Sequence, residues 1–90
     1  MIPKEYNLSN AYPNPFNPTT TLSFAIPVIY NVILSIYDIN GRIIKELIKD
    51  AMDAGYHSVV WNADNYGSGV CFVKMVAGEF VNTQKLMLIK

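Results

Sequence analysis

Short segments of this chain alternate large apolar side chains with small or polar ones, and this period of two constrains the fold more than any other feature. Over residues 22–26 every second side chain is large and apolar, and Pro27 ends the pattern. Residues 32–37 alternate in the same way and are rich in β-branched side chains. Successive side chains of a strand point to opposite faces of a sheet. These segments therefore predict β-strands with one buried face.

Further segments carry the same signal between turn residues. We predict one strand that begins at Arg42 or Ile43 and three more that cover residues 56–61, 70–77 and 80–89. Residues 6–8 are a candidate first strand. Residues 43–48 also fit helical spacing, but this segment is short and lies between turns, which favours a strand. Strands that recur about every 8 to 12 residues are typical of an antiparallel sandwich. We predict an all-β fold, an immunoglobulin-like antiparallel β-sandwich of about seven strands, with Trp61 as an anchor in its core.

Two polar stretches predict connections between these strands. Asn40 and Gly41 lie between two apolar runs, and they predict a tight hairpin turn because both residue types tolerate a positive φ. Residues 62–69 are rich in Asn, Asp and Gly and predict a loop. The order of its residues is weakly similar to a calcium loop, but the twelfth position is Val73 rather than Glu. We expect a polar turn, and a weak ion site completed by Asp38 or Asp53 stays an alternative.

The chain has one histidine and one cysteine, which limits the chemistry it can perform. A catalytic nucleophile needs a base within hydrogen-bond reach and a third group that orients the base. Only His57 could be that base, and it lies inside a predicted strand without a nucleophile elbow nearby. Cys71 lies in an apolar strand, where a thiol behaves as a small buried hydrophobe. The ligand sets of zinc and iron–sulfur sites are missing, so we predict no enzyme, no metal and no cofactor.

Charge and hydropathy limit the partners of the chain. Seven Lys and Arg residues balance seven Asp and Glu residues, whereas nucleic-acid binding needs a basic surface, so we predict no nucleic-acid partner. The longest apolar run is broken by Asn31, Ser35 and Asp38 and falls short of the roughly 20 residues that span a bilayer. We therefore predict no membrane-spanning segment. The first residues lack the basic-then-apolar order of a signal peptide, so we expect export to be directed by another part of the chain or by something outside it.

Three prolines within six residues make residues 12–20 distinctive. Proline fixes φ and pushes the preceding residue into an extended conformation, which predicts a rigid, non-helical segment before the first long strand. The stretch Leu8-Ser9-Asn10-Ala11-Tyr12-Pro13-Asn14-Pro15-Phe16-Asn17-Pro18-Thr19-Thr20 resembles the opening of the type IX secretion C-terminal sorting domains, type A. The similarity continues through Tyr37-Asp38-Ile39-Asn40-Gly41-Arg42, Gly55-Tyr56-His57, Val60-Trp61-Asn62, Gly67-Ser68-Gly69-Val70-Cys71-Phe72, Lys85 and Leu88-Ile89-Lys90. Cys71 departs from the family pattern, which usually has an aromatic residue there.

This resemblance implies a non-catalytic domain at the C-terminus of a larger protein exported by a Gram-negative bacterium. Residues 1–11 would be the end of a linker with the candidate first strand, and residues 12–90 would be the sorting domain. Its partners would be the type IX outer-membrane translocon, a sortase-like peptidase that removes the domain in many members, and the N-terminal cargo domains of the parent protein. The cargo would pass through the periplasm and then reach the cell surface or the medium.

Recognition of a folded signal would use exposed features of distinct shape. The candidates are a stiff segment, a projecting turn, a glycine in a loop and the lysines of the last strand: Pro13, Asn14, Pro15, Phe16, Asn17, Pro18, Asn40, Gly41, Arg42, Gly69, Lys85 and Lys90. Each also has a structural explanation, because the prolines could cover a sheet edge and edge lysines discourage aggregation. As a hypothesis, the closing strand pairs with the translocon by β-augmentation.

Two other functions fit a sandwich of this kind, because one fold serves many functions. The alternative is an immunoglobulin-like accessory or carbohydrate-binding module of an extracellular hydrolase, which a row of exposed aromatic residues along one sheet would favour. A third hypothesis is a scaffold domain similar to the immunoglobulin-like part of flagellar hook-capping proteins.

Overall fold

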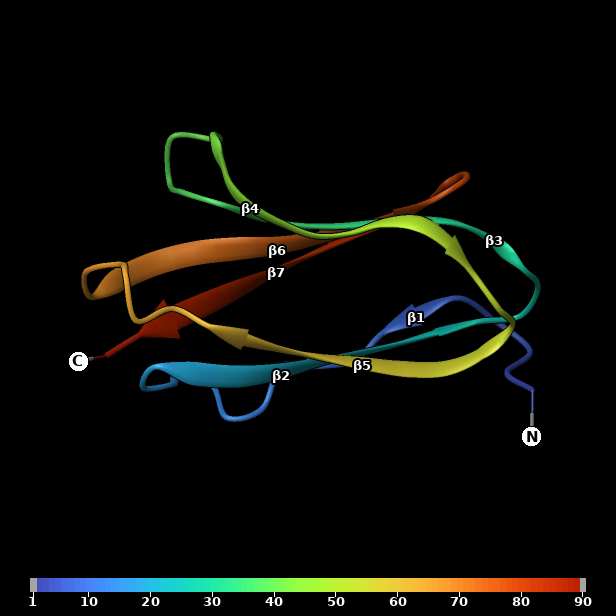
Figure 1. The fold of residues 1–90 in the computed structure, drawn as a ribbon, viewed down its shortest axis with the longest axis horizontal. Coiled ribbons are helices and arrows are strands. Elements are labelled where there is room, and N and C mark those ends of the chain that lie inside the picture. Colours follow the sequence, from blue (N-terminus) through green and yellow to red (C-terminus); the bar gives the residue numbers. More distant parts are fainter. Residues whose placement is uncertain (1, 90) are drawn as a thin grey trace.

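The computed structural model describes residues 2–89, which form two antiparallel β-sheets packed face to face (Figure 1). One sheet has the strand order β1-β2-β5 and the other has the order β4-β3-β6-β7. The strands are β1 (Asn7–Leu8), β2 (Thr19–Ile26), β3 (Tyr30–Tyr37), β4 (Ile43–Met52), β5 (Gly55–Asn62), β6 (Gly69–Ala77) and β7 (Phe80–Leu88). No helix occurs in this part of the chain, and so none that could cross a membrane. The predicted all-β antiparallel sandwich is confirmed.

The alternation in the sequence determines which side chains fill the space between the sheets. The large apolar side chains at every second position are buried over residues 22–26 of β2 and over residues 32–36 of β3, and the small Ala25 and Ser35 between them are buried as well. Strands β6 and β7, in the same sheet as β3, contribute Val73, Met75 and Leu86, none of which is exposed to solvent. Removing these apolar surfaces from water is the main force that holds the two sheets together.

The residues that precede the first long strand also pack against the sandwich. The candidate first strand is present as β1, whose Leu8 is buried in the core and pairs with Phe24 of β2. The Gln84 side chain on β7 donates a hydrogen bond of 2.7 Å to the carbonyl oxygen of Leu8. Tyr6 stacks on Phe80 with 5.5 Å between the ring centroids. The chain before residue 12 therefore contacts both sheets.

β4 is a strand, as predicted, and it continues to Met52. Its register against β3 shifts twice, so Ile44 and Leu47 are extra residues without a partner on β3. Each such bulge turns the following side chain to the other face of the strand. As a result Ile44, Leu47 and Ile48 all pack against the core. This spacing of three and then one explains why residues 43–48 also fit a helical pattern.

The predicted hairpin between β3 and β4 forms, with a positive φ at Gly41 and not at Asn40. Gly41 has a φ of 82°, and no residue other than glycine has a positive φ within residues 2–89. The Gly41 amide donates to the Asp38 carbonyl over 3.0 Å, and the Asp38 amide donates to the Arg42 carbonyl over 2.9 Å. This is the pattern of a three-residue hairpin loop that ends on a left-handed glycine. Because Gly41 alone adopts the left-handed conformation, Asn40 does not need to.

Candidate recognition surface

The proline segment, residues 13–18, passes from one sheet to the edge of the other. Just before it, Tyr12 and Thr21 of β2 exchange two main-chain hydrogen bonds, of 3.1 and 2.8 Å. The Thr20 hydroxyl, which is fully buried, donates a hydrogen bond of 2.7 Å to the Pro13 carbonyl. The peptide bonds before all three prolines of the segment are cis. The start of the segment is therefore fixed to β2.

The middle of the proline segment lies along the outer edge of β7. The Phe16 amide donates to the Met87 carbonyl, and the Ile89 amide donates to the Phe16 carbonyl, both over 2.9 Å. The Asn14 carboxamide adds two bonds, because its nitrogen donates to the Lys85 carbonyl over 2.9 Å and its oxygen accepts from the Met87 amide over 3.1 Å. β7 is the last strand of its sheet. The segment therefore covers the last part of the edge that β7 would otherwise present to solvent.

Phe16 anchors this arrangement in the core. Its side chain is 2% exposed, and its ring lies 5.5 Å from the ring of Trp61 on β5. Trp61 is 3% exposed and also contacts the ring of Tyr66, 5.9 Å away, in the loop after β5. The indole N–H is buried and donates no hydrogen bond within the described part of the chain. Trp61 therefore joins the proline segment to the β5–β6 loop through ring packing alone.

A shallow cleft of about 400 Å³ lies beside Trp61, between the β3–β4 turn and the β5–β6 loop. Its apolar lining includes Ile39, Ile44, Trp61 and Leu88, and Gly69 lies at its rim. The Tyr66 hydroxyl donates to the Ile44 carbonyl over 2.8 Å and so joins the loop to β4. Figure 1 shows both connections at the end of the sandwich where β7 ends. The turn, the glycine loop and the closing strand thus meet at one end of the domain.

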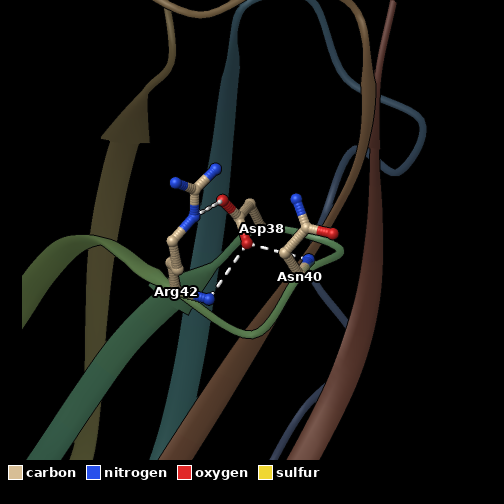
Figure 2. Close-up of polar contacts among 3 residues, drawn as sticks. All are labelled: Asp38, Asn40 and Arg42. Atoms are coloured by element: carbon tan, nitrogen blue, oxygen red, sulfur yellow. Dashed lines mark hydrogen bonds and ion pairs between the residues drawn. The ribbon is translucent and has the colours of Figure 1, made fainter.

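The projecting turn is organised by one carboxylate (Figure 2). Asp38 Oδ1 accepts from the amides of Asn40 and Arg42, over 2.9 and 3.0 Å. Asp38 Oδ2 accepts from Arg42 Nε over 3.2 Å, while the Arg42 side chain stays 76% exposed. The hydrogen bond from the Arg42 amide, aided by the Asn40 amide and by the Arg42 charge, holds the pKa of Asp38 below its ordinary value against a smaller effect of desolvation. The turn is therefore fixed while its guanidinium group stays available.

We expect the turn to loosen only in acid. Because the pKa of Asp38 is lowered on folding, its contribution is complete above the unfolded pKa of about 3.9 and is lost as the pH falls through the lower folded pKa. In an NMR titration, the amide signals of Asn40 and Arg42 should move with a midpoint below that of an ordinary aspartate. An Asp38→Ala variant should lack this movement. A midpoint at or above about 3.9 would contradict the assignment.

The remaining chemical candidates are engaged in packing. His57 donates to the Asp53 carbonyl over 2.7 Å and stacks on Phe24 with 5.2 Å between ring centroids. Cys71 is buried in β6, and desolvation raises the pKa of its thiol, which disfavours the reactive thiolate. In the loop after β5, Asn62 Oδ1 accepts from the Asp64 amide over 2.9 Å. No group of three or more His, Cys, Asp or Glu residues within residues 2–89 is placed to hold a metal ion.

The structure places the predicted recognition residues in different environments. Those on the surface are Pro13, Asn14, Pro15, Asn17, Asn40, Gly41, Arg42, Gly69 and Lys85. Pro18 is half-buried, and Phe16 is buried in the core, so its side chain does not form part of the surface. Lys90 lies outside the described residues. The contact of Asn14 with β7 joins residues 71 apart in the chain, and no local sequence pattern signals it.

Comparisons with known proteins give a family match and a structural neighbour. Residues 10–90 match the family described as "Secretion system C-terminal sorting domain". A comparison with curated proteins gives no match. Among solved structures, the chain is similar to PorZ, described as an essential bacterial surface component of the type-IX secretion system of Porphyromonas gingivalis, with a TM-score of 0.64 and 20% sequence identity. The match covers 93% of this chain and 12% of PorZ, and at this identity it shows the fold alone.

Proposed function

Because this chain belongs to the family of secretion system C-terminal sorting domains, we propose that it directs an attached N-terminal cargo through the type IX outer-membrane translocon. The observation that carries the proposal is the family match over residues 10–90. The domain would be of type A and would occupy residues 12–90, after the end of a linker. Cargo and domain would pass through the periplasm, and a sortase-like peptidase would then remove the domain while the cargo is attached to the surface or released.

The arrangement of the domain supports recognition of a folded surface. The Asp38–Arg42 ion pair fixes an exposed turn beside the cleft, and the end of β7 lies at the same end of the sandwich. A preformed surface costs little conformational entropy when a partner binds it. We propose that the translocon contacts this end and adds a strand of its own to β7, with main-chain hydrogen bonds supplying affinity. The domain would act as a signal and not as a catalyst.

The carbohydrate-binding alternative has no comparable support. It would be favoured by a row of exposed aromatic residues along one sheet. The aromatic side chains that are largely exposed within residues 2–89 are Tyr12, Tyr30 and Tyr56. Tyr12 precedes β2, Tyr30 begins β3 and Tyr56 lies near the start of β5, so they belong to three separate segments. They do not form the continuous platform that stacking on a sugar chain needs.

A secretion assay tests the proposed function. Residues 1–90 are fused behind a periplasmic signal peptide and a fluorescent reporter, in a strain with a working type IX system and in its translocon-deletion mutant. We expect the reporter at the surface or in the medium only in the first strain, and removal of residues 85–90 should abolish its export. The reporter with its signal peptide alone is the control and should stay in the periplasm. Retention of the complete fusion in both strains would reject the proposal.

A further inference from the structure

We propose that residues 14–16 form a removable strap over the edge of β7, which the partner strand must displace before it can pair with β7. This inference rests on the proposed function, because it concerns the same closing strand. The strap occupies four main-chain groups on that edge: the carbonyls of Lys85 and Met87 and the amides of Met87 and Ile89. A strand added to this part of β7 needs the same groups. The partner and the strap therefore exclude one another.

β7 is suited to strand addition once its edge is free. Its nine residues pair with β6 without a register shift, so its main-chain groups repeat regularly. β4, at the opposite edge of the same sheet, carries Lys45, Glu46, Lys49 and Asp50 and two bulges, which are features that oppose strand addition. Of these two edges, only that of β7 is regular, and it is the one covered by the strap. We infer that the strap protects a strand that would otherwise recruit any extended chain.

The contacts of the strap also describe the partner that would fit. Phe16 pairs with Leu88 in the parallel orientation, so an incoming strand that takes its place would run parallel to β7. Phe16 fills a buried site against Trp61. An extended segment with a large apolar or aromatic side chain at the corresponding position would refill this site and restore the buried contact. The structure thus assigns an extended peptide with such a side chain as the chemical class of the partner.

The strap is held in a way that allows it to open by itself. It lies outside the named strands, and two of its three residues, Asn14 and Pro15, are exposed. Two of its four hydrogen bonds to β7 come from a single exposed side chain, that of Asn14. Phe16 is its one buried side chain, so opening has to expose that ring, but a segment held by so few contacts opens more easily than the core of a domain. We therefore expect the strap to open without unfolding of the sandwich.

Hydrogen exchange on the 90-residue chain tests the opening without any partner. In Asn14→Ala, the amide of Ile89 should exchange about tenfold faster or more, although its bond to the Phe16 carbonyl is not removed by the substitution. The matched control is Asn17→Ala, another exposed asparagine before a proline, for which no hydrogen bond is seen to β7. Val73, in the middle of β6, should exchange at the unaltered rate in both variants. If the amides of Ile89 and Val73 exchange at the same rate in every variant, the strap opens only when the whole sandwich unfolds, and the proposal is overturned.

Export kinetics test whether the partner displaces the strap. If the strap is displaced, a reporter fused to the Asn14→Ala domain should be exported at least as fast as a reporter fused to the unaltered domain. The reason is that the partner replaces the lost hydrogen bonds, and a pulse-chase assay measures the export rate. Slower export of Asn14→Ala than of the unaltered domain would show that the strap is itself read and would overturn displacement. If the unaltered domain is not exported, the proposed function fails. The exchange experiment would still decide whether the strap opens by itself.

Discussion

Replacing Trp61 with alanine is expected to lower the free energy of unfolding by about 3 to 5 kcal/mol. The side chain is 3% exposed and is packed between Phe16 and Tyr66. Its removal leaves a cavity where β5 and the β5–β6 loop meet the proline segment, which comes from a distant part of the chain. Urea denaturation followed by far-UV circular dichroism measures the effect. A loss below about 1 kcal/mol would show that the site collapses around the missing ring.

Trp61→Phe is the matched variant and should cost much less than Trp61→Ala. The indole N–H donates no hydrogen bond within residues 2–89, so its removal breaks none. Phenylalanine keeps an aromatic ring for contact with Phe16 and Tyr66. If Trp61→Phe were as destabilising as Trp61→Ala, the indole nitrogen would have to make a bond in solution, for example to water.

Phe16→Ala should be the second most damaging substitution, with a loss of about 3 kcal/mol or more in the free energy of unfolding. It empties the buried site and removes the buried side-chain anchor of the strap. The same denaturation experiment measures it, and the exposed Asn17→Ala should lie within about 0.5 kcal/mol of the unaltered chain. An effect of Phe16→Ala no larger than that of Asn17→Ala would contradict the buried position.

The double variant separates the contact between the two rings from their individual burial. Because Phe16 and Trp61 lie 5.5 Å apart, the costs of Phe16→Ala and Trp61→Ala should not add. We expect a coupling of about 0.5 to 3 kcal/mol, since a site already emptied by one substitution loses less from the other. Additive costs would mean that the rings do not interact.

The strands could be predicted from the sequence because period-two alternation depends only on neighbouring residues. The strand of residues 32–37 lies inside β3, and residues 56–61 lie inside β5. The bulges of β4 could not be predicted, because Ile44 and Leu47 become extra residues only when β4 pairs with β3. The length of the β3–β4 loop could not be predicted for a related reason, since it is fixed by how the two strands meet.

The candidate recognition surface was predictable only in part. Asn40, Gly41 and Arg42 form an exposed turn because Asx and Gly residues specify such turns locally. Phe16 looked like part of an exposed stiff segment, yet it is buried, because its partners Trp61 and Leu88 come from later strands. The asymmetry between Asn14 and Asn17 is equally invisible in the sequence, where both precede proline. Contacts between distant residues decide which of two similar side chains is fixed.

The pairing of Phe16 with Leu88 also sets the order in which parts of the domain can fold. Asn14 must wait for main-chain partners 71 and 73 residues later, and closing so long a loop carries an entropic cost that only an assembled β7 edge can offset. During synthesis the proline segment leaves the ribosome long before Leu88 exists. A truncated translation product that lacks the last strand would therefore have no edge for the proline segment to bind, and Phe16 would keep Trp61 as a partner but lose Leu88.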